Sequence, residues 1–271
     1  MRRVTPKVFL IGETQVHLDG MEDYLKHLGD GAIEWLEKYT SADTDDPLPC
    51  PSQPELLSEF YGRLCYRSWK PGLNANVTKI REGNDVYLDN VLKVKHGSVI
   101  EHAVVNLVFA DVSRVFTHEL VRHRAGVAIS QESLRFVRLT DLGLWLPPEA
   151  ESQPWLVEMF EKTYKTLEEL QVTMAERLGL DDEGVQFSEK KVLTSMMRRL
   201  APEGMSTTIG ASFNFRALRH VLTMRTPKGA ESEMRVVMDQ LGPMCKERWP
   251  NLFADFTRDQ DGTWTPKYEK V

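Results

Sequence analysis

The stretch HGSVIEHAVVNLVFADVSRVFTHELVRHRAGVAISQESLRFVR, residues 96–138, decides the fold and carries most of the candidate chemistry. Within it, Ala103–Ala110 is rich in β-branched and aromatic residues and apolar on both faces, which predicts a buried central strand. Ser113 is a suitable N-cap, so we expect a helix from there to about Arg124. A second, short strand is expected at Phe136–Leu139.

Apolar spacing elsewhere in the chain predicts several helices and two more strands. The helices are expected at Met21–Leu28, Ile33–Tyr39, Glu55–Tyr66, Trp155–Leu178, Glu183–Leu200, Phe215–Arg225 and Ala230–Cys245. The strands are expected at Val8–Ile11 and Thr207–Phe213, with Asn214 capping the helix that follows. Together these elements predict an α+β fold, in which long helices pack on a small central, mostly antiparallel sheet.

We divide the chain into an N-terminal extension packed on the core (residues 1–54), a core domain (55–256) and a C-terminal tail (257–271). The extension looks peripheral and includes an acidic, proline-rich loop at Ser41–Pro54. The segment after Trp249 is polar and is expected to be loose.

The composition excludes several classes of protein. A net charge of −6 and a pI near 5.7 argue against a general nucleic-acid binder. The three cysteines, Cys50, Cys65 and Cys245, form no C-x-x-C pair, so neither a disulfide framework nor a zinc site is expected. No apolar run reaches membrane-spanning length. We therefore expect a soluble cytoplasmic protein.

A metal site is not expected at His118-Glu119-Leu120-Val121-Arg122-His123 either. This segment resembles the H-E-x-x-H zinc motif, but its second histidine comes one residue too late. On a helix, residues five apart lie roughly 140° apart around the axis, so both rings cannot reach one metal ion.

The cations of this region predict a site for anionic groups. Arg122 and Arg124 flank His123 with no acid directly beside them, and Arg122 follows two apolar residues, which makes it the arginine least expected to be plain surface charge. A buried guanidinium needs an anion, and phosphate suits it. Ser133, close to Arg135, fits phosphate binding better than a nucleophile, because no G-x-S-x-G elbow is present.

Four segments, in order, resemble the flavin-dependent thymidylate synthases over roughly Glu55–Trp249. Arg122-His123-Arg124, a spacer and Ser130–Arg135 resemble the family's signature, and His96–His102 resembles the segment that opens its central strand. Asn214–Arg225 resembles a helix that ends in a functional arginine. Arg198 precedes a proline, as an arginine does in the family.

This resemblance implies a homotetramer with shared active sites. It also implies bound FAD and the reductive methylation of dUMP with methylenetetrahydrofolate and NADPH. By resemblance, the residues along the flavin are Ser68, His96, Ser98, Arg122, His123, Arg124, Asn214 and His220. Those at the nucleotide are Glu119, Gln131, Ser133, Leu134, Arg135, Arg198 and Arg225. Arg122 and Arg225 are the catalytic candidates, since they could stabilise negative charge that develops on the pyrimidine.

Several positions depart from the family's pattern. The spacer between Arg124 and Ser133 is one residue longer than usual, so Ala125–Ile129 is expected to bulge or shift. Glu119 stands where a glutamine is expected, and His220 where asparagine is common.

Two other functions stay open from the sequence. One is an enzyme with the same fold that methylates UMP or dUMP in nucleoside-antibiotic synthesis. It stays open because no residue in the sequence is identified as contacting the ribose 2′-hydroxyl. A binding module for nucleic-acid phosphates would use the same arginines, although the net charge of −6 weighs against it.

Overall fold

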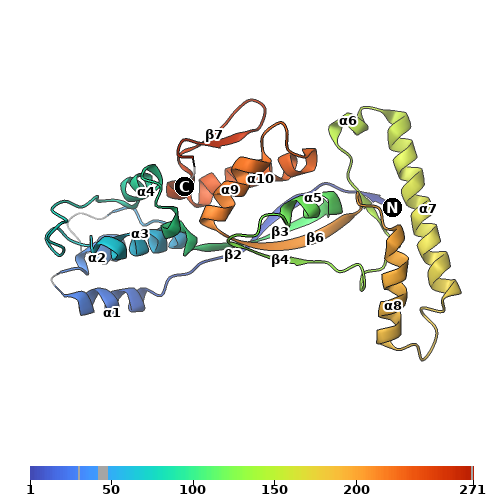
Figure 1. Ribbon diagram of the computed structural model, residues 1–271, viewed down its shortest axis with the longest axis horizontal. Coiled ribbons are helices and arrows are strands. Elements are labelled where there is room, and N and C mark those ends of the chain that lie inside the picture. Colours follow the sequence, from blue (N-terminus) through green and yellow to red (C-terminus); the bar gives the residue numbers. More distant parts are fainter. Residues whose placement is uncertain (30, 42–47, 270) are drawn as a thin grey trace.

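A four-stranded antiparallel sheet crosses the middle of the molecule, in the order β2-β3-β6-β4 (Figure 1). The computed structural model describes residues 1–29, 31–41, 48–269 and 271. The strands are β2 (Lys7–Glu13), β3 (Val104–Ser113), β6 (Ser206–Asn214) and β4 (Val127–Gln131). This arrangement confirms the predicted α+β class with a small antiparallel sheet.

Strand β3 is the predicted central strand, and it is buried on one face. Val105, Leu107 and Phe109 are almost fully buried, whereas the residues between them are partly exposed, as the alternation of side chains along a strand requires. At its end, Oγ of Ser113 accepts a hydrogen bond from the Phe116 amide at 3.1 Å, which confirms the predicted cap. The helix that follows, α5 (Arg114–Leu120), ends earlier than expected.

Helices α5, α9 (Phe215–Arg225) and α10 (Ser232–Arg248) lie over the buried face of the sheet (Figure 1). The Asn214 side chain caps α9 by accepting from the Ala217 amide at 2.8 Å, as predicted. The core here joins apolar residues of β3 and β6 to those of the helices. Each fully buried large apolar side chain contributes roughly 1.5–3 kcal/mol, so this layer provides most of the stability of the sheet.

The other face of the sheet is open. Phe9 and Ile11 of β2 are 46% and 65% exposed, and a shallow hollow lies over Asn106, Ser212 and Ala128. In Figure 1 no helix covers this side of the strands. The open face is therefore available to a further layer of structure.

The N-terminal part forms a second core at one end of the sheet. Its helices are α1 (Leu18–Leu28), α2 (Glu34–Thr40) and α3 (Gln53–Tyr66), whereas the neighbouring α4 (Asn84–Lys93) and the 3-10 helix η1 (Gly97–Glu101) pack into the main core. Trp35 and Trp69 lie at the centre of this core. The predicted strand at Val8–Ile11 is observed as β2 and is an edge strand of the central sheet, so the N-terminal segment is not merely peripheral. Residues 42–47 of the expected loop lie outside the described residues.

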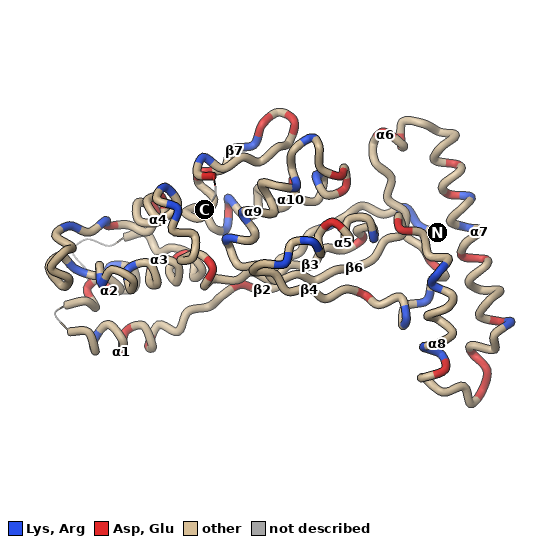
Figure 2. The backbone as a smooth tube through the Cα atoms, viewed as in Figure 1, with Lys and Arg blue, Asp and Glu red and all other residues tan. Residues whose placement is uncertain are grey.

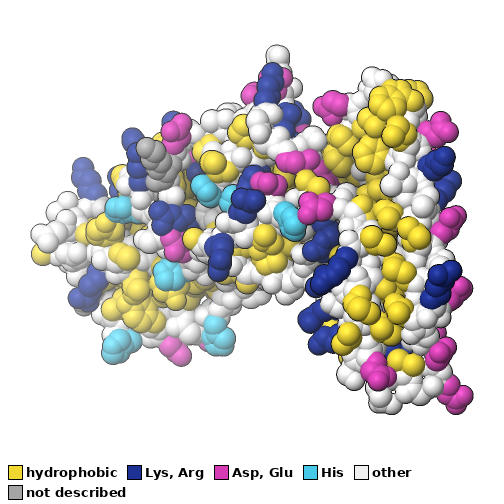
Figure 3. Space-filling model, turned by 45° about the vertical axis from the view of Figure 1, so that its right-hand side comes forward, with side chains coloured by type: hydrophobic (Ala, Val, Ile, Leu, Met, Phe, Trp, Pro, Cys, Tyr) yellow, Lys and Arg dark blue, Asp and Glu magenta, His cyan; other side chains and the backbone are white. Residues whose placement is uncertain are grey.

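A helical arm extends from the other end of the sheet (Figure 1). It comprises α6 (Pro148–Glu151), α7 (Pro154–Arg177), α8 (Phe187–Met197) and the 3-10 helix η2 (Arg198–Leu200), next to a parallel pairing of β1 (Arg2–Arg3) with β5 (Gly143–Leu144). Apolar side chains such as Trp155, Met159 and Phe187 remain exposed, and Figure 3 shows hydrophobic groups along the arm.

The strand predicted at Phe136–Leu139 is wrong. The amides of Phe136 and Val137 both donate to the carbonyl oxygen of Ser133, at 2.9 and 3.1 Å, and so close a turn. The strand of this region is β4, which precedes the turn and pairs with β6. Of its five residues only Val127 and Ile129 are β-branched, so it lacks the long β-branched and aromatic run by which β3 was recognised.

The prediction of a loose C-terminal segment is also wrong. Helix α11 (Pro250–Phe253) and a hairpin of β7 (Phe256–Arg258) with β8 (Trp264–Pro266) pack on α10 and α9. Trp264 is 4% exposed and lies against Gly242, where an added Cβ would come within 2.2 Å of the indole. This hairpin therefore belongs to the main core.

Charges are mixed along the whole chain, as Figure 2 shows. Among the helices of the described ranges, none has the length and apolar character needed to cross a membrane. Within the same ranges, no group of three or more His, Cys, Asp or Glu side chains is arranged to hold a metal ion.

Candidate active site

The guanidinium of Arg225 is held at the end of α9 by three hydrogen bonds. Nη1 donates to Glu119 Oε2 at 2.6 Å, Nη2 donates to the Glu119 carbonyl at 3.1 Å, and Nε donates to Nε2 of His123 at 2.8 Å. A planar guanidinium presents its donors in a fixed fork, so these contacts fix its orientation. The sequence suggested that Glu119 contacts the nucleotide; in this chain its carboxylate pairs with Arg225.

His123 is neutral in this arrangement. Burial, the neighbouring charge of Arg225 and His220 lower the pKa of His123 to about 4, while Glu119 acts in the opposite direction. The His220 ring packs edge-on at 5.8 Å. Because Nε2 of His123 accepts the bond from Arg225, the geometry assigns the ring proton to Nδ1.

Arg122 and Arg124 lie on the surface beside this cluster. Both are exposed, which corrects the expectation that Arg122 is buried. Among the described residues, no carboxylate lies within ion-pair distance of either arginine. Two guanidinium groups that lack a protein anion are therefore free to bind an external one.

The turn between α5 and β4 brings the signature segment to the start of α9. Gly126 adopts a φ of +71°, and an added Cβ would lie 2.4 Å from Nδ2 of Asn214. The Asn214 amide donates to the Gly126 carbonyl at 2.9 Å. Val127–Gln131 pair with β6 in unbroken register, so β4 contains no bulge, and a shift of Ala125–Ile129 relative to the family stays a prediction. Ser98, in η1, is exposed at the same end of the sheet.

Ser68 and His96 line a separate cavity of about 520 Å³ between α3, α4 and the segment 76–81. The His96 ring stacks near Tyr66 at 6.0 Å, and Nη1 of Arg63 donates to the Ser68 carbonyl at 2.6 Å. This cavity has room for a ligand of cofactor size. Tyr66 and Arg63 were not predicted as lining residues, because nothing in the local sequence relates them to His96.

Ser133, Leu134 and Arg135 form the turn after β4, next to α8. Ser133 Oγ accepts from the Arg135 amide at 3.4 Å, and Thr194 Oγ1 donates to the Arg135 carbonyl at 2.7 Å. The Arg135 side chain is exposed, whereas Leu134 is buried in the small core of the arm. The Leu134 side chain therefore packs in the arm, and its predicted contact with the substrate stays a prediction.

Gln131 and Arg198 flank that turn. Nε2 of Gln131 donates to Thr117 Oγ1 at 3.1 Å, so its side chain is turned toward α5. Arg198, in η2, is half-buried. Glu132, which was not singled out from the sequence, accepts from the Thr208 amide at 2.9 Å and ties β4 to β6.

One chain does not bring all the predicted site residues together. Arg225, His123, Asn214 and Ser98 gather near the end of the sheet that adjoins η1. Arg135 contacts α8, at the opposite end of the sheet in Figure 1. The predicted flavin residues and the predicted phosphate residues are thus separated within a protomer.

Among the described residues, two arginines are buried, Arg63 and Arg219, and neither was predicted as a site residue. Arg63 pairs with Glu59 one helical turn earlier, and Arg219 pairs with Asp255 at 2.7 Å. The spacing of Glu59 and Arg63 was a visible signal, because side chains four apart on a helix are neighbours. Both arginines have protein carboxylates as partners, so they need no ligand.

Comparison with known proteins gives one consistent family. The family described as thymidylate synthase complementing protein matches residues 50–251. A flavin-dependent thymidylate synthase from Mycobacteroides abscessus is 34% identical over 202 residues, which cover 74% of this chain and 78% of the relative. Another, from Corynebacterium diphtheriae, is 31% identical over 230 residues, 83% of each chain.

Two solved structures show the same fold. The UMP/dUMP methylase PolB from Streptomyces cacaoi, bound with 5-Br dUMP, has a TM-score of 0.58 at 14% identity and covers 93% of this chain and 95% of its own. Thymidylate synthase X from Helicobacter pylori, with FAD and dUMP, has a TM-score of 0.51 at 20% identity and covers 73% and 94%.

Proposed function

Because this chain belongs to the family of flavin-dependent thymidylate synthases, we propose that it converts dUMP to dTMP by reductive methylation at C5. Methylenetetrahydrofolate is the carbon donor, NADPH is the reductant and FAD is the bound cofactor. The observation that carries the proposal is the oriented Arg225 beside two unpaired arginines, Arg122 and Arg124. We assign the enzyme to the cytoplasm, in keeping with its free cysteines.

The side chains at the sheet end fit an anionic dinucleotide. Arg122 and Arg124 are exposed cations that lack a carboxylate partner among the described residues, and the nearby cavity is lined by Ser68 and His96. The residues that would hold FAD are Ser68, His96, Ser98, Arg122, His123, Arg124, Asn214 and His220. When bound, FAD supplies the redox chemistry of the methylation.

Arg225 and Arg122 provide the positive charge of the site. A fixed guanidinium stabilises negative charge on a pyrimidine more effectively than a mobile one, because it needs no reorganisation. Glu119 and His123 act as positioning residues for Arg225. Neutral His123 adds no second positive charge, and its lone pair remains available to accept from Arg225.

The nucleotide phosphate is assigned to Ser133, Arg135 and Arg198. Arg135 is exposed, and Thr194 fixes its backbone. Because these residues lie at the other end of the sheet from Arg225, the proposal needs two protomers for each complete site. The open sheet face and the apolar arm support a homotetramer in which such sites are shared.

The test is to purify the protein, record its absorbance spectrum and its elution in gel filtration, and measure turnover of dUMP. A yellow protein that elutes as a tetramer and converts dUMP is expected. Arg122→Ala is expected to lower kcat by roughly 10²–10³-fold, the usual loss for one preorganised donor. Arg135→Ala is expected mainly to raise KM for dUMP, because it removes a phosphate contact. Arg258→Ala, an exposed arginine of the β7–β8 hairpin, is the matched control. A colourless protein that takes up no added FAD contradicts the proposal.

Methylation of UMP is the second candidate. The UMP/dUMP methylase PolB matches 93% of this chain, including part of the N-terminal segment, whereas the thymidylate synthase X structure matches 73%. The ratio of kcat/KM for UMP and dUMP decides between them. A ratio that favours UMP supports the second candidate, and one that favours dUMP excludes it.

A further inference from the structure

The cavity that Ser68 and His96 line has cationic walls and no acidic ones. Its volume is about 520 Å³, and its other lining residues are Arg63, Tyr66, Asn76, Val77, Thr78, Lys79, Ile80, Arg81, Tyr87, Asn90, Val91 and Val94. Among the described residues that line it, three are lysine or arginine and none is aspartate or glutamate. Because the chain as a whole has a net charge of −6, a cavity without carboxylates indicates a ligand that carries negative charge.

One of the three cations, Arg63, is already neutralised within the protein. Its Nε donates to Oε1 of the buried Glu59 at 2.7 Å. Its Nη1 and Nη2 donate to the carbonyl oxygens of Ser68 and Arg81, both at 2.6 Å. Arg63 therefore has no donor group to spare for a ligand, but it ties the backbone of Arg81 to that of Ser68 and so holds two walls of the cavity together.

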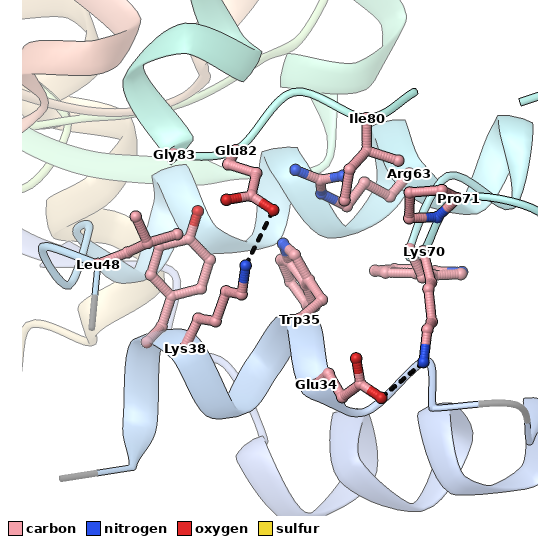
Figure 4. A pocket seen from close by; sticks show the side chains of 12 residues that line it. Glu34, Trp35, Lys38, Leu48, Arg63, Lys70, Pro71, Ile80, Glu82 and Gly83 are labelled. Atoms are coloured by element: carbon pink, nitrogen blue, oxygen red, sulfur yellow. Dashed lines mark hydrogen bonds and ion pairs between the residues drawn. The ribbon is translucent and has the colours of Figure 1, made fainter. Parts of the chain in front are cut away.

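Lys79 and Arg81 are the other two cations, and neither has a protein anion. Both are exposed, and no carboxylate in the described part of the chain lies within ion-pair distance of either side chain. The acidic residue beside them, Glu82, does not line this cavity: its carboxylate accepts from Lys38 of α2 at 2.9 Å (Figure 4). The segment 76–82 thus presents its two cations to the cavity and turns its acid toward α2.

An aromatic pair lines the cavity together with these cations. The Tyr66 side chain is 50% exposed, and its ring lies nearly parallel to the exposed His96 ring, with 6.0 Å between centroids and 13° between planes. Exposed ring faces of this kind pack well against a flat heteroaromatic group. The cavity therefore combines a ring platform with two unpaired cations, which suits a ligand that carries both a planar ring and phosphate.

We propose that Lys79 and Arg81 bind the pyrophosphate of the flavin dinucleotide, which makes the segment 76–81 part of the coenzyme site. This inference rests on the proposed function, because FAD is favoured over other anions by the presence of Ser68 and His96 in the same cavity. Ammonium and guanidinium groups form strong charge-assisted hydrogen bonds to phosphate oxygens. Two cations also match the two negative charges of the pyrophosphate link.

The test measures the affinity of the full-length protein, freed of flavin, for FAD by the quenching of flavin fluorescence. Lys79→Met and Arg81→Met should each weaken FAD binding about tenfold, the loss expected for one charge-assisted contact. Inorganic pyrophosphate should compete with FAD in the parent, and about tenfold more weakly in either variant. Lys79→Arg keeps the charge and should bind FAD as the parent does. Lys93→Met, at an exposed lysine of α4 outside the cavity lining, is the matched control.

Pyrophosphate competition in the parent tests the proposal without any substitution, so a variant that fails to fold does not protect it. Three results overturn the proposal: equal FAD affinity in the parent and both methionine variants, no competition by pyrophosphate, or unchanged FAD affinity with a raised KM for NADPH or methylenetetrahydrofolate. The third result would assign the cations to another anion. A parent protein that binds no FAD contradicts the proposed function as well, whereas FAD binding that does not respond to either variant overturns this inference alone.

Discussion

Replacing Arg225 by glutamine should raise the pKa of His123. That pKa is lowered to about 4 by burial first, then by the Arg225 guanidinium and His220. Arg225→Gln removes the positive charge of the guanidinium and leaves the Glu119 carboxylate without its ion-pair partner. The negative charge of Glu119 then favours the protonated form of His123. Burial remains, so the pKa should rise but stay below the ordinary 6.5.

The protonation of His123 should also make the free energy of unfolding depend on pH. A tenfold change in proton affinity corresponds to about 1.4 kcal/mol, so a fully shielded His123 would contribute about 3 kcal/mol. Because the ring is half-buried, we expect about 2 kcal/mol. His123 binds its proton more weakly in the folded state than in the unfolded state. This stability is therefore present above pH 6.5 and is lost as the pH falls from 6.5 through about 4.

Carbon-13 NMR of the histidine Cε1 atoms, with His123→Asn to assign the signal, measures the pKa directly. Urea unfolding across the same pH range measures the free energy. Arg258→Gln, a distant surface arginine, should leave the His123 signal unchanged. The reasoning is refuted if His123 titrates near 6.5 in the parent, or if Arg225→Gln leaves its pKa where it was.

Three further changes test the architecture. Gly126→Ala forces a side chain into a backbone with a φ of +71° and against Asn214, so it should cost about 2 kcal/mol or more in a urea unfolding experiment. Arg219→Met leaves the buried carboxylate of Asp255 unpaired and should cost about 3–5 kcal/mol, seen as a lower thermal midpoint. Burial raises the pKa of Glu233 to about 7, so its contribution is present below pH 4.5 and is lost as the pH rises through 7; Glu233→Gln should flatten unfolding free energy across that window.

Each change has its own control. Gly229→Ala adds the same methyl group where nothing lies within 4 Å, and it should be nearly neutral. Equal costs at the two glycines would contradict the steric argument at Gly126. Adding Asp255→Leu to Arg219→Met should recover part of the loss, and no recovery would mean that packing alone is responsible. An unchanged pH profile in Glu233→Gln would show that another group titrates.

The fold was predicted well where one residue type determines local structure. Ser113 and Asn214 were recognised as caps, and the apolar run at Ala103–Ala110 was recognised as a strand, because those signals are local. Strand β4 was missed because its pairing with β6 depends on a partner about 80 residues away in sequence, and because only two of its five residues are β-branched. The hairpin after Trp249 was missed for a similar reason: its polar composition hides Trp264, whose burial comes from the surface of α10.

For the candidate site, the sequence identified candidate side chains but not the residues that they contact. Arg225 and His123 were selected separately, yet their contact joins residues 102 positions apart and could not be read from either segment. The expected burial of Arg122 failed because apolar neighbours on a helix end do not determine which way the next side chain points. The burial of the Leu134 side chain was not predicted for the same reason, since it depends on the arm.

The pairing of β2 with β3 has a consequence for shortened forms of this protein. If proteolysis removed the segment through Glu13, the backbone amides and carbonyls of β3 would become an unprotected sheet edge. Trp249 would at the same time lose the Glu13 carboxylate to which its indole donates. Such trimmed molecules should associate edge to edge and precipitate, so an intact β2 protects the enzyme from aggregation.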